Sequence, residues 1–152
     1  MRLDALLRPK SIAIIGASEK PTIGRRLIAS LERIGFRGAI YPINPNYSSV
    51  LGRPCYPSIA DTPEVPEAAA FCVCHRLVLG PLKAAAGRGV QAAVIYDGGF
   101  AERGPDGQRL QADIVAICRE ADIALCGPNC MGVLNPVDRR RPTSRSCAIR
   151  RA

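Results

Sequence analysis

The sequence has no run of apolar residues that approaches the roughly 20 needed for a membrane helix. The first ten residues are interrupted by Asp4, Arg8, Pro9 and Lys10, which is not the pattern of a signal peptide. Charged residues make up 22% of the chain and hydrophobic residues 47%, which argues against a disordered protein. We therefore expect one folded cytoplasmic domain, and 152 residues are enough to bury a core.

Acidic residues are absent from the last fourteen positions, which are rich in arginine. Six of the eight net positive charges belong to Arg139, Arg140, Arg141, Arg145, Arg150 and Arg151, so the rest of the chain carries +2. Charge concentrated at one end is more typical of a solvated chain end than of a nucleic-acid surface. We expect a folded domain over residues 1–136, a basic, disordered tail over 137–152, and no nucleic-acid partner.

The seven cysteines occur without secretory features, so we expect reduced thiols and not disulfides. Two pairs, Cys72 with Cys74 and Cys126 with Cys130, resemble paired metal ligands, but their spacings match no common zinc pattern. The sheet predicted below would also place the two pairs near opposite edges, roughly 19 Å apart. We therefore expect no metal site.

Short apolar runs alternate with longer helical patterns along the chain. Apolar runs predict strands over residues 12–15, 39–44, 68–74, 91–96 and 123–126. Periodic stretches predict helices over residues 23–34, 76–87 and 106–121. This alternation predicts an α/β fold, namely a Rossmann-like, doubly wound, parallel five-stranded sheet in the order 3-2-1-4-5.

The turn after the first predicted strand lacks the glycines of a dinucleotide-binding loop. That fingerprint is G-x-G-x-x-G, whereas here Gly16 is followed by no glycine before Gly24. The start of the next helix still offers backbone N–H groups near Ile23 and Gly24, and Lys20 and Arg25 add positive charge. We expect an anion-binding loop here.

The end of the second predicted strand lacks the acid that holds the ribose hydroxyls of NAD. Asn44, Pro45 and Asn46 stand there instead, and no acid follows until Asp61. A neutral strand end suits a ligand whose ribose carries a phosphate. NADP and coenzyme A both meet that description.

Six motifs, in the same order along the chain, resemble those of a known family. They are SIAIIGAS, Pro21 with Gly24, GFRGAIYPINPN, GRPCYPSIAD, GFAERG and GPNCMGVLNP, and they span about residues 8–136. With these motifs the chain resembles the coenzyme-A-binding domain of ADP-forming acyl-CoA synthetases, relatives of the succinyl-CoA synthetase α subunit. The resemblance favours coenzyme A over NADP as the ligand.

The resemblance also implies which residues contact coenzyme A. The nucleotide end would be lined by Gly16, Ala17, Ser18 and Lys20, joined by Gly24 and Arg25 of the anion-binding loop. The adenosine side would be bordered by Asn44, Pro45 and Asn46, and the ligand would run along Val73 and Cys74. The pantetheine arm would pass Tyr96, Asp97 and Gly98, and its thiol would emerge near Asn129. At Cys74 and at Asp97-Gly98 the chain departs from the proline and the Ser-Ala usual in this family.

The sequence lacks the parts that carry catalysis in these ligases. Their phosphohistidine lies in a following domain and a separate ATP-grasp part binds nucleotide, whereas the one histidine here, His75, is outside that motif. We expect no catalytic residue, Cys130 included, and interpret the chain as a CoA-docking module whose partners are CoA or acyl-CoA and a separate ligase subunit. The alternatives are an NADP-binding Rossmann fragment and a CoA-responsive regulatory protein.

Overall fold

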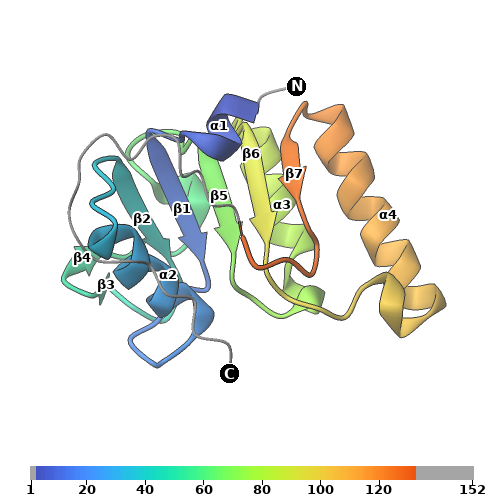
Figure 1. The fold of residues 1–152 in the computed structure, drawn as a ribbon, viewed down its shortest axis with the longest axis horizontal. Coiled ribbons are helices and arrows are strands. Elements are labelled where there is room, and N and C mark those ends of the chain that lie inside the picture. The colour runs from blue at the N-terminus through green and yellow to red at the C-terminus, as the bar shows by residue number, and fades with distance from the viewer. Residues whose placement is uncertain (1–2, 133–152) are drawn as a thin grey trace.

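A computed structural model describes residues 3–132, in which a parallel five-stranded sheet lies between two layers of helices (Figure 1). The sheet strands are β1 (Ser11–Ile15), β2 (Ala39–Ile43), β5 (Ala68–Phe71), β6 (Ala92–Ile95) and β7 (Ala124–Cys126). The α-helices are α1 (Leu3–Leu7), α2 (Ile23–Arg33), α3 (Leu79–Gly87) and α4 (Pro105–Glu120). Short elements complete the fold. They are a hairpin of β3 (Ser49–Val50) and β4 (Arg53–Pro54), and the 3-10 helices η1 (Ile59–Asp61), η2 (His75–Leu77) and η3 (Ala101–Arg103). The predicted α/β class, the five strands and the three longer helices are confirmed, while residues 137–152 lie outside the described part.

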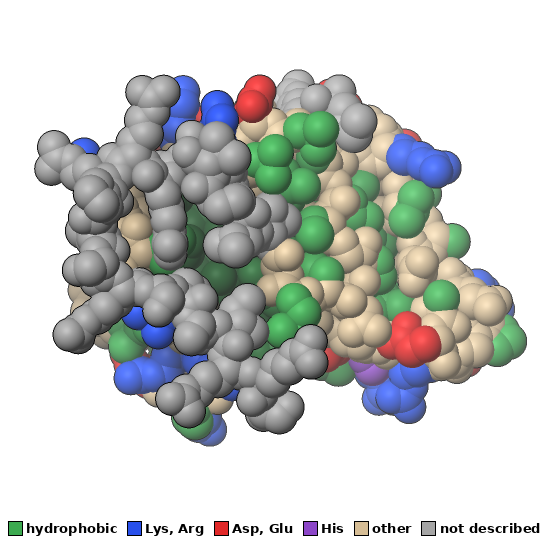
Figure 2. Space-filling model, in the orientation of Figure 1, with side chains coloured by type: hydrophobic (Ala, Val, Ile, Leu, Met, Phe, Trp, Pro, Cys, Tyr) green, Lys and Arg blue, Asp and Glu red, His purple; other side chains and the backbone are tan. Residues whose placement is uncertain are grey.

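The core is split by the sheet into two apolar layers. Successive residues of a strand point to opposite faces, so Ala13 and Ile15 of β1 pack towards α3 and α4, and Ile12 and Ile14 pack towards α1 and α2. All five residues of β1 are buried, as a central parallel strand requires. On the α2 face, apolar side chains reach the surface over the half of the sheet nearer β7 (Figure 2). Among the described helices, none is long and apolar enough to span a membrane.

The predicted strand order is wrong, because the third long strand, β5, pairs with β1 and not with β2. The observed order is β2-β1-β5-β6-β7, which is 2-1-3-4-5 in the numbering of the five predicted strands. The outer edge of β2 is instead occupied by Tyr56, whose N–H donates to the Pro42 carbonyl and whose carbonyl accepts from Asn44 N–H, both at 2.9 Å. Pro42 itself sits in an edge strand, where a residue without an N–H is tolerated. At the start of β5, Glu67 N–H donates to Ser11 Oγ at 3.0 Å and sets β5 beside β1.

This order also overturns the expected separation of the two cysteine pairs. Only β6 lies between β5 and β7, so two strand spacings, about 10 Å, separate the strands that precede the pairs. Cys72, Cys126 and Cys130 all lie close enough to the Tyr96 phenol to perturb it electrostatically. The distance argument against a shared metal therefore fails, although the spacing argument is unaffected.

The buried thiol of Cys118 makes stability depend on alkaline pH. Cys118 is 3% exposed in α4, and burial raises its pKa from 9.0 to about 11. Folding thus favours the protonated thiol, and this stabilisation is complete below pH 9 and is lost as pH rises from 9 through 11. Between pH 7.5 and pH 10 we expect wild type to lose about 1 kcal/mol more unfolding free energy than Cys118→Ala. Denaturant titrations at both pH values measure this.

The matched control for this prediction is Cys74→Ala, which removes an exposed thiol. With metal ions removed by a chelator, its loss of stability over this pH range should stay larger than that of Cys118→Ala. Equal pH dependence in wild type and Cys118→Ala would show that the Cys118 thiol does not contribute.

Candidate functional site

The carboxyl ends of β1, β2 and β5 open into a pocket of about 530 Å³. Its walls come from the ends of these strands, the segment before and including the start of η1, and the first turns of α3. The lining residues are Ile15, Gly16, Ile43, Asn44, Pro45, Asn46, Pro57, Ser58, Ile59, Val73, Leu77, Gly80, Pro81 and Ala84, none of which carries a charge. The pocket borders β1 and β5, between which the strand order reverses, and this is where open α/β sheets bind ligands.

Gly16 brings the turn after β1 against the neighbouring strand end. It has φ +85°, in the left-handed region, and a Cβ here would lie 2.6 Å from the Cys72 carbonyl oxygen and 2.7 Å from Val73 Cγ1. Gly24, in the first turn of α2, makes a similar approach, since a Cβ there would lie 2.7 Å from the Gly16 carbonyl oxygen. The two predicted glycines therefore allow the first loop, α2 and the end of β5 to pack closely together.

Asn44 joins the loops that follow β1 and β2. Its Nδ2 donates to the Ala17 carbonyl at 2.7 Å, and its Oδ1 accepts from Asn46 N–H at 3.0 Å. Beside it, the hydroxyl of the buried Ser18 lies 3.2 Å from that of Tyr47 and accepts from Lys20 N–H at 3.0 Å. These bonds fix the shape of the pocket rim before any ligand arrives.

The basic loop before α2 is arranged differently from the sequence expectation. Arg25 donates from Nη1 to Glu19, to the carboxylate at 2.9 Å and to the backbone carbonyl at 3.0 Å. The other Glu19 oxygen accepts from Leu51 N–H at 2.7 Å, and Thr22 caps α2 by accepting from Arg25 N–H at 3.4 Å. Lys20 is exposed. Glu19, which the sequence analysis did not single out, thus offsets the charge of Arg25 and ties this loop to the β3–β4 hairpin.

A second group of predicted residues lies at the carboxyl ends of β5, β6 and β7. Asn129 N–H donates to the Asp97 carbonyl at 3.0 Å, and the Asp97 carboxylate accepts from His75 N–H at 2.7 Å. A Cβ on Gly98 would lie 3.6 Å from Asn129 Oδ1, an ordinary contact. Cys74, Asp97, Gly98 and Asn129 therefore form one polar cluster built from three loops.

Tyr96, which directly precedes Asp97, is partly buried. Burial raises the pKa of its phenol, and the neighbouring thiols of Cys72, Cys130 and Cys126 raise it further. Cys126 and Cys130 have their sulfur atoms 3.8 Å apart, and Cys130 also donates to the Ile95 carbonyl at 3.3 Å. The phenol thus stays protonated at neutral pH and can act as a hydrogen-bond donor.

The predicted site residues consequently fall into groups. Gly16, Asn44, Pro45, Asn46 and Val73 line the pocket. Ala17, Ser18 and Lys20 lie in the loop behind its rim, and Gly24 and Arg25 lie in the first turn of α2. Cys74, Tyr96, Asp97, Gly98 and Asn129 lie outside the pocket lining, in the segments that follow β5, β6 and β7. Sequence reasoning missed the wall formed by η1 and α3; its signal was present in the motif GRPCYPSIAD, where Ser58 caps η1 by accepting from Ala60 N–H at 3.1 Å.

Comparison with known proteins identifies the family of this fold. The family model described as CoA binding domain matches residues 10–136. A trans-feruloyl-CoA synthase from an unknown prokaryotic organism is 40% identical over 139 residues, and an ADP-forming acetate–CoA ligase from Archaeoglobus fulgidus is 38% identical over 136. These alignments cover 91% and 88% of this chain but 20% of each relative, so the chain spans about a fifth of their length.

Solved structures give the same fold in a large and in a small protein. A dinucleotide-forming acetyl-coenzyme A synthetase from Ca. Korarchaeum cryptofilum, in complex with phosphate and ADP, superposes with a TM-score of 0.79 at 34% identity, over 84% of this chain and 27% of that one. A hypothetical protein from Pyrococcus horikoshii superposes with a TM-score of 0.68 at 29% identity, over 85% and 83%. The fold therefore occurs both as a part of a longer chain and as nearly a whole one.

Proposed function

Because this chain belongs to the CoA-binding domain family, we propose that it is the CoA-docking module of an ADP-forming acyl-CoA synthetase. The observation that carries this proposal is the uncharged pocket at the switch point of the sheet. Its volume of about 530 Å³ lies within the range of roughly 300–1,000 Å³ typical of small-molecule sites. The neutral end of β2 supports coenzyme A over NAD, which needs a carboxylate there.

We place the nucleotide end of coenzyme A in the pocket and the thiol end near Asn129. Gly16, Asn44, Pro45, Asn46 and Val73 supply the pocket walls. Ala17, Ser18, Gly24 and Arg25 lie beside the phosphates in this placement, and the exposed Lys20 supplies positive charge. The cluster of Cys74, Tyr96, Asp97, Gly98 and Asn129 supplies donors and acceptors along the arm.

The complete reaction belongs, in this proposal, to parts beyond the docking module. The chain spans about a fifth of its curated relatives, and two relatives from Pyrococcus furiosus are named as α subunits of acetate–CoA ligases. We therefore propose a separate ligase subunit as partner and no acyl-CoA synthesis by this chain alone. The matched range 10–136 supports the proposed division into a domain over 1–136 and a tail over 137–152. A cytoplasmic location is supported by six free cysteines among the described residues.

Coenzyme A should raise the melting temperature, whereas NAD should not. A ligand present at 100 times its Kd adds about 2.7 kcal/mol to the free energy of unfolding. For a domain of this size that corresponds to roughly 5–10 °C. Thermal melts with coenzyme A, NADP and NAD in parallel measure the effect, and calorimetric titration gives the affinities.

The NADP sample is the control that separates the two ligands with a ribose phosphate. A shift with coenzyme A and none with NADP supports the docking role. A shift with NADP and none with coenzyme A would replace it by the NADP-binding alternative.

A further inference from the structure

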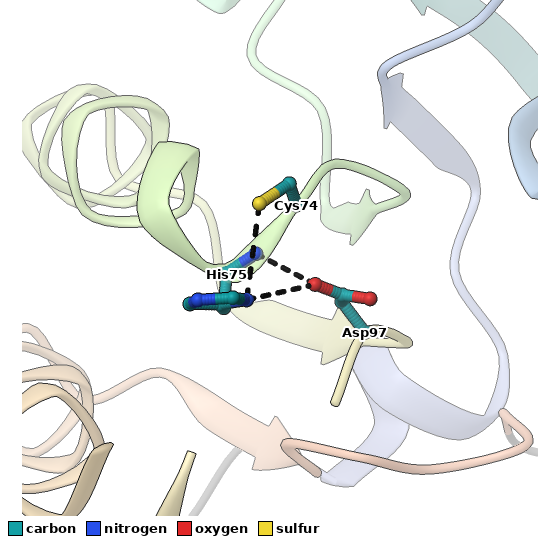
Figure 3. Close-up of side chains that lie close together, drawn as sticks. All are labelled: Cys74, His75 and Asp97. Carbon is teal, nitrogen blue, oxygen red and sulfur yellow. Dashed lines mark hydrogen bonds and ion pairs between the residues drawn. The ribbon is translucent and has the colours of Figure 1, made fainter. Parts of the chain in front are cut away.

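Three side chains with metal-binding atoms converge just beyond β5 and β6. Cys74 follows β5, His75 begins η2 and Asp97 follows β6, and Figure 3 shows the thiol and the carboxylate both directed at the same imidazole nitrogen. The Cys74 sulfur lies 3.8 Å from His75 Nδ1, and Asp97 Oδ2 lies 3.4 Å from that nitrogen. We propose that these three residues bind one divalent cation of the zinc class.

The spacing of the three atoms suits a tetrahedral ion. With zinc bonds of about 2.3 Å to sulfur and about 2.1 Å to nitrogen and oxygen, the separations of 3.8 and 3.4 Å correspond to ligand–metal–ligand angles of about 120° and about 110°. The third separation, between sulfur and carboxylate oxygen, is at most 4.8 Å. The exposed Cys74 thiol can turn towards Asp97 to complete the arrangement.

The distance between the imidazole nitrogen and the carboxylate is long for a direct hydrogen bond. A nitrogen–oxygen hydrogen bond in proteins is usually 2.7–3.2 Å long, and the ring nitrogen lies 3.4 Å from the carboxylate. The ring nitrogen is thus close enough to share an ion with the carboxylate and too far from it for a good direct hydrogen bond. A catalytic Cys-His-Asp relay is also excluded, because the relay needs thiol and carboxylate on different imidazole nitrogens and both contacts here involve Nδ1.

The donor set favours zinc-class ions over magnesium or calcium. One thiolate, one imidazole and one carboxylate are the three ligand types of protein zinc sites, whereas magnesium and calcium prefer oxygen alone. Three protein ligands leave the fourth position open to water. Solvent can reach the site, since Cys74 is exposed and the side chains of His75 and Asp97 are 20% and 38% exposed.

The surrounding contacts hold the ligands in place before an ion binds. Asp97 is positioned by two backbone N–H groups, from His75 to its carboxylate at 2.7 Å and from Asn129 to its carbonyl at 3.0 Å. The His75 ring packs edge-on against the buried Phe100, with ring centroids 6.1 Å apart. Such orientation of ligands by outer contacts is typical of metal sites. The sequence-based expectation of no metal rested on cysteine spacing and did not consider His75 with Asp97.

The test is a Co²⁺ titration of the untagged full chain, stripped of metal by a chelator and free of coenzyme A. We expect one Co²⁺ per chain, a near-ultraviolet sulfur-to-cobalt charge-transfer band, strong visible bands of tetrahedral Co²⁺, and loss of all of them on adding Zn²⁺. Cys74→Ser should abolish the charge-transfer band. Asp97→Asn keeps an acceptor for His75 N–H, and we expect it to weaken binding at least about tenfold, since even partners outside the ligand set contribute that much.

Cys126→Ser is the matched control, because it removes a thiol that lies outside the proposed metal site, in the close pair of Cys126 and Cys130. It should bind Co²⁺ as wild type does, and circular dichroism should show that every variant is folded. The proposal is overturned if wild type binds no Co²⁺, if the charge-transfer band persists in Cys74→Ser, or if Cys126→Ser loses it. Because coenzyme A is absent, these outcomes do not depend on the proposed docking function.

Discussion

Replacing Gly16 with alanine is expected to lower the free energy of unfolding by about 2–5 kcal/mol. Holding a residue with a Cβ in the left-handed region costs roughly 1–2 kcal/mol, and φ here is +85°. The new Cβ would also overlap the Cys72 carbonyl oxygen at 2.6 Å, which is rigid backbone, and forced overlap costs about 1–3 kcal/mol. Denaturant unfolding of the purified variant measures the sum.

Gly35→Ala is the matched control, because Gly35 also has a positive φ, +75°, but a Cβ there would come within 4 Å of no described residue other than its own chain neighbours. It should lose only the backbone part, about 1–2 kcal/mol. Gly16 lines the pocket and Gly35 does not, so we expect coenzyme A affinity to fall in Gly16→Ala alone. Equal losses of stability in the two variants would contradict the role assigned to the close contact.

The strongly patterned parts of the fold were predictable from the sequence. The apolar run ending at Gly16 indicated a strand buried on both faces, and the periodic apolar positions from Ile23 predicted α2 to its end. Residues directly after strands were predictable as site residues because parallel strands end at one edge. Gly16, Asn44 and Val73 do meet there.

The strand order was not predictable because it depends on contacts between distant segments. Handedness and alternation allow β5 to lie beside either β2 or β1. The choice follows from Tyr56, which pairs with the outer edge of β2, and from Glu67, which bonds to Ser11 across 56 residues. No local pattern around either residue indicates these bonds.

The convergence of Cys74, His75 and Asp97 was missed for a related reason. His75 and Asp97 are 22 residues apart, and Asp97 was assigned to a ligand-contacting loop by resemblance. Only the pairing of β5 with β6 brings them together. In the same way, the pairing of Arg25 with Glu19 was hidden, since a sequence shows positive charge near a helix start but not the acid that turns towards it.

Asn44→Asp is expected to weaken coenzyme A binding at least tenfold and to destabilise the fold by about 1–3 kcal/mol. The amide Nδ2 of Asn44 donates to the Ala17 carbonyl at 2.7 Å. A carboxylate at position 44 would place one acceptor against another, the Ala17 carbonyl, and this would leave a polar group without its hydrogen bond. The new negative charge would also face the ligand phosphates in the pocket, and like charges about 4 Å apart repel by about 1 kcal/mol in water and by more in a less polar site. A loss of about 1.4 kcal/mol already corresponds to tenfold in Kd.

Asn46→Asp separates the two causes, because it adds the same charge to the pocket lining at an exposed position whose side chain does not hold Ala17. We expect Asn46→Asp to weaken coenzyme A through repulsion while its unfolding free energy stays within about 0.5 kcal/mol of wild type, as is usual for surface substitutions. Calorimetric titration and denaturant unfolding of both variants give the two quantities independently. If neither substitution changes coenzyme A affinity, the nucleotide end does not lie in this pocket. A stability loss confined to Asn44→Asp would still identify the Asn44–Ala17 bond as the link between the loops after β1 and β2.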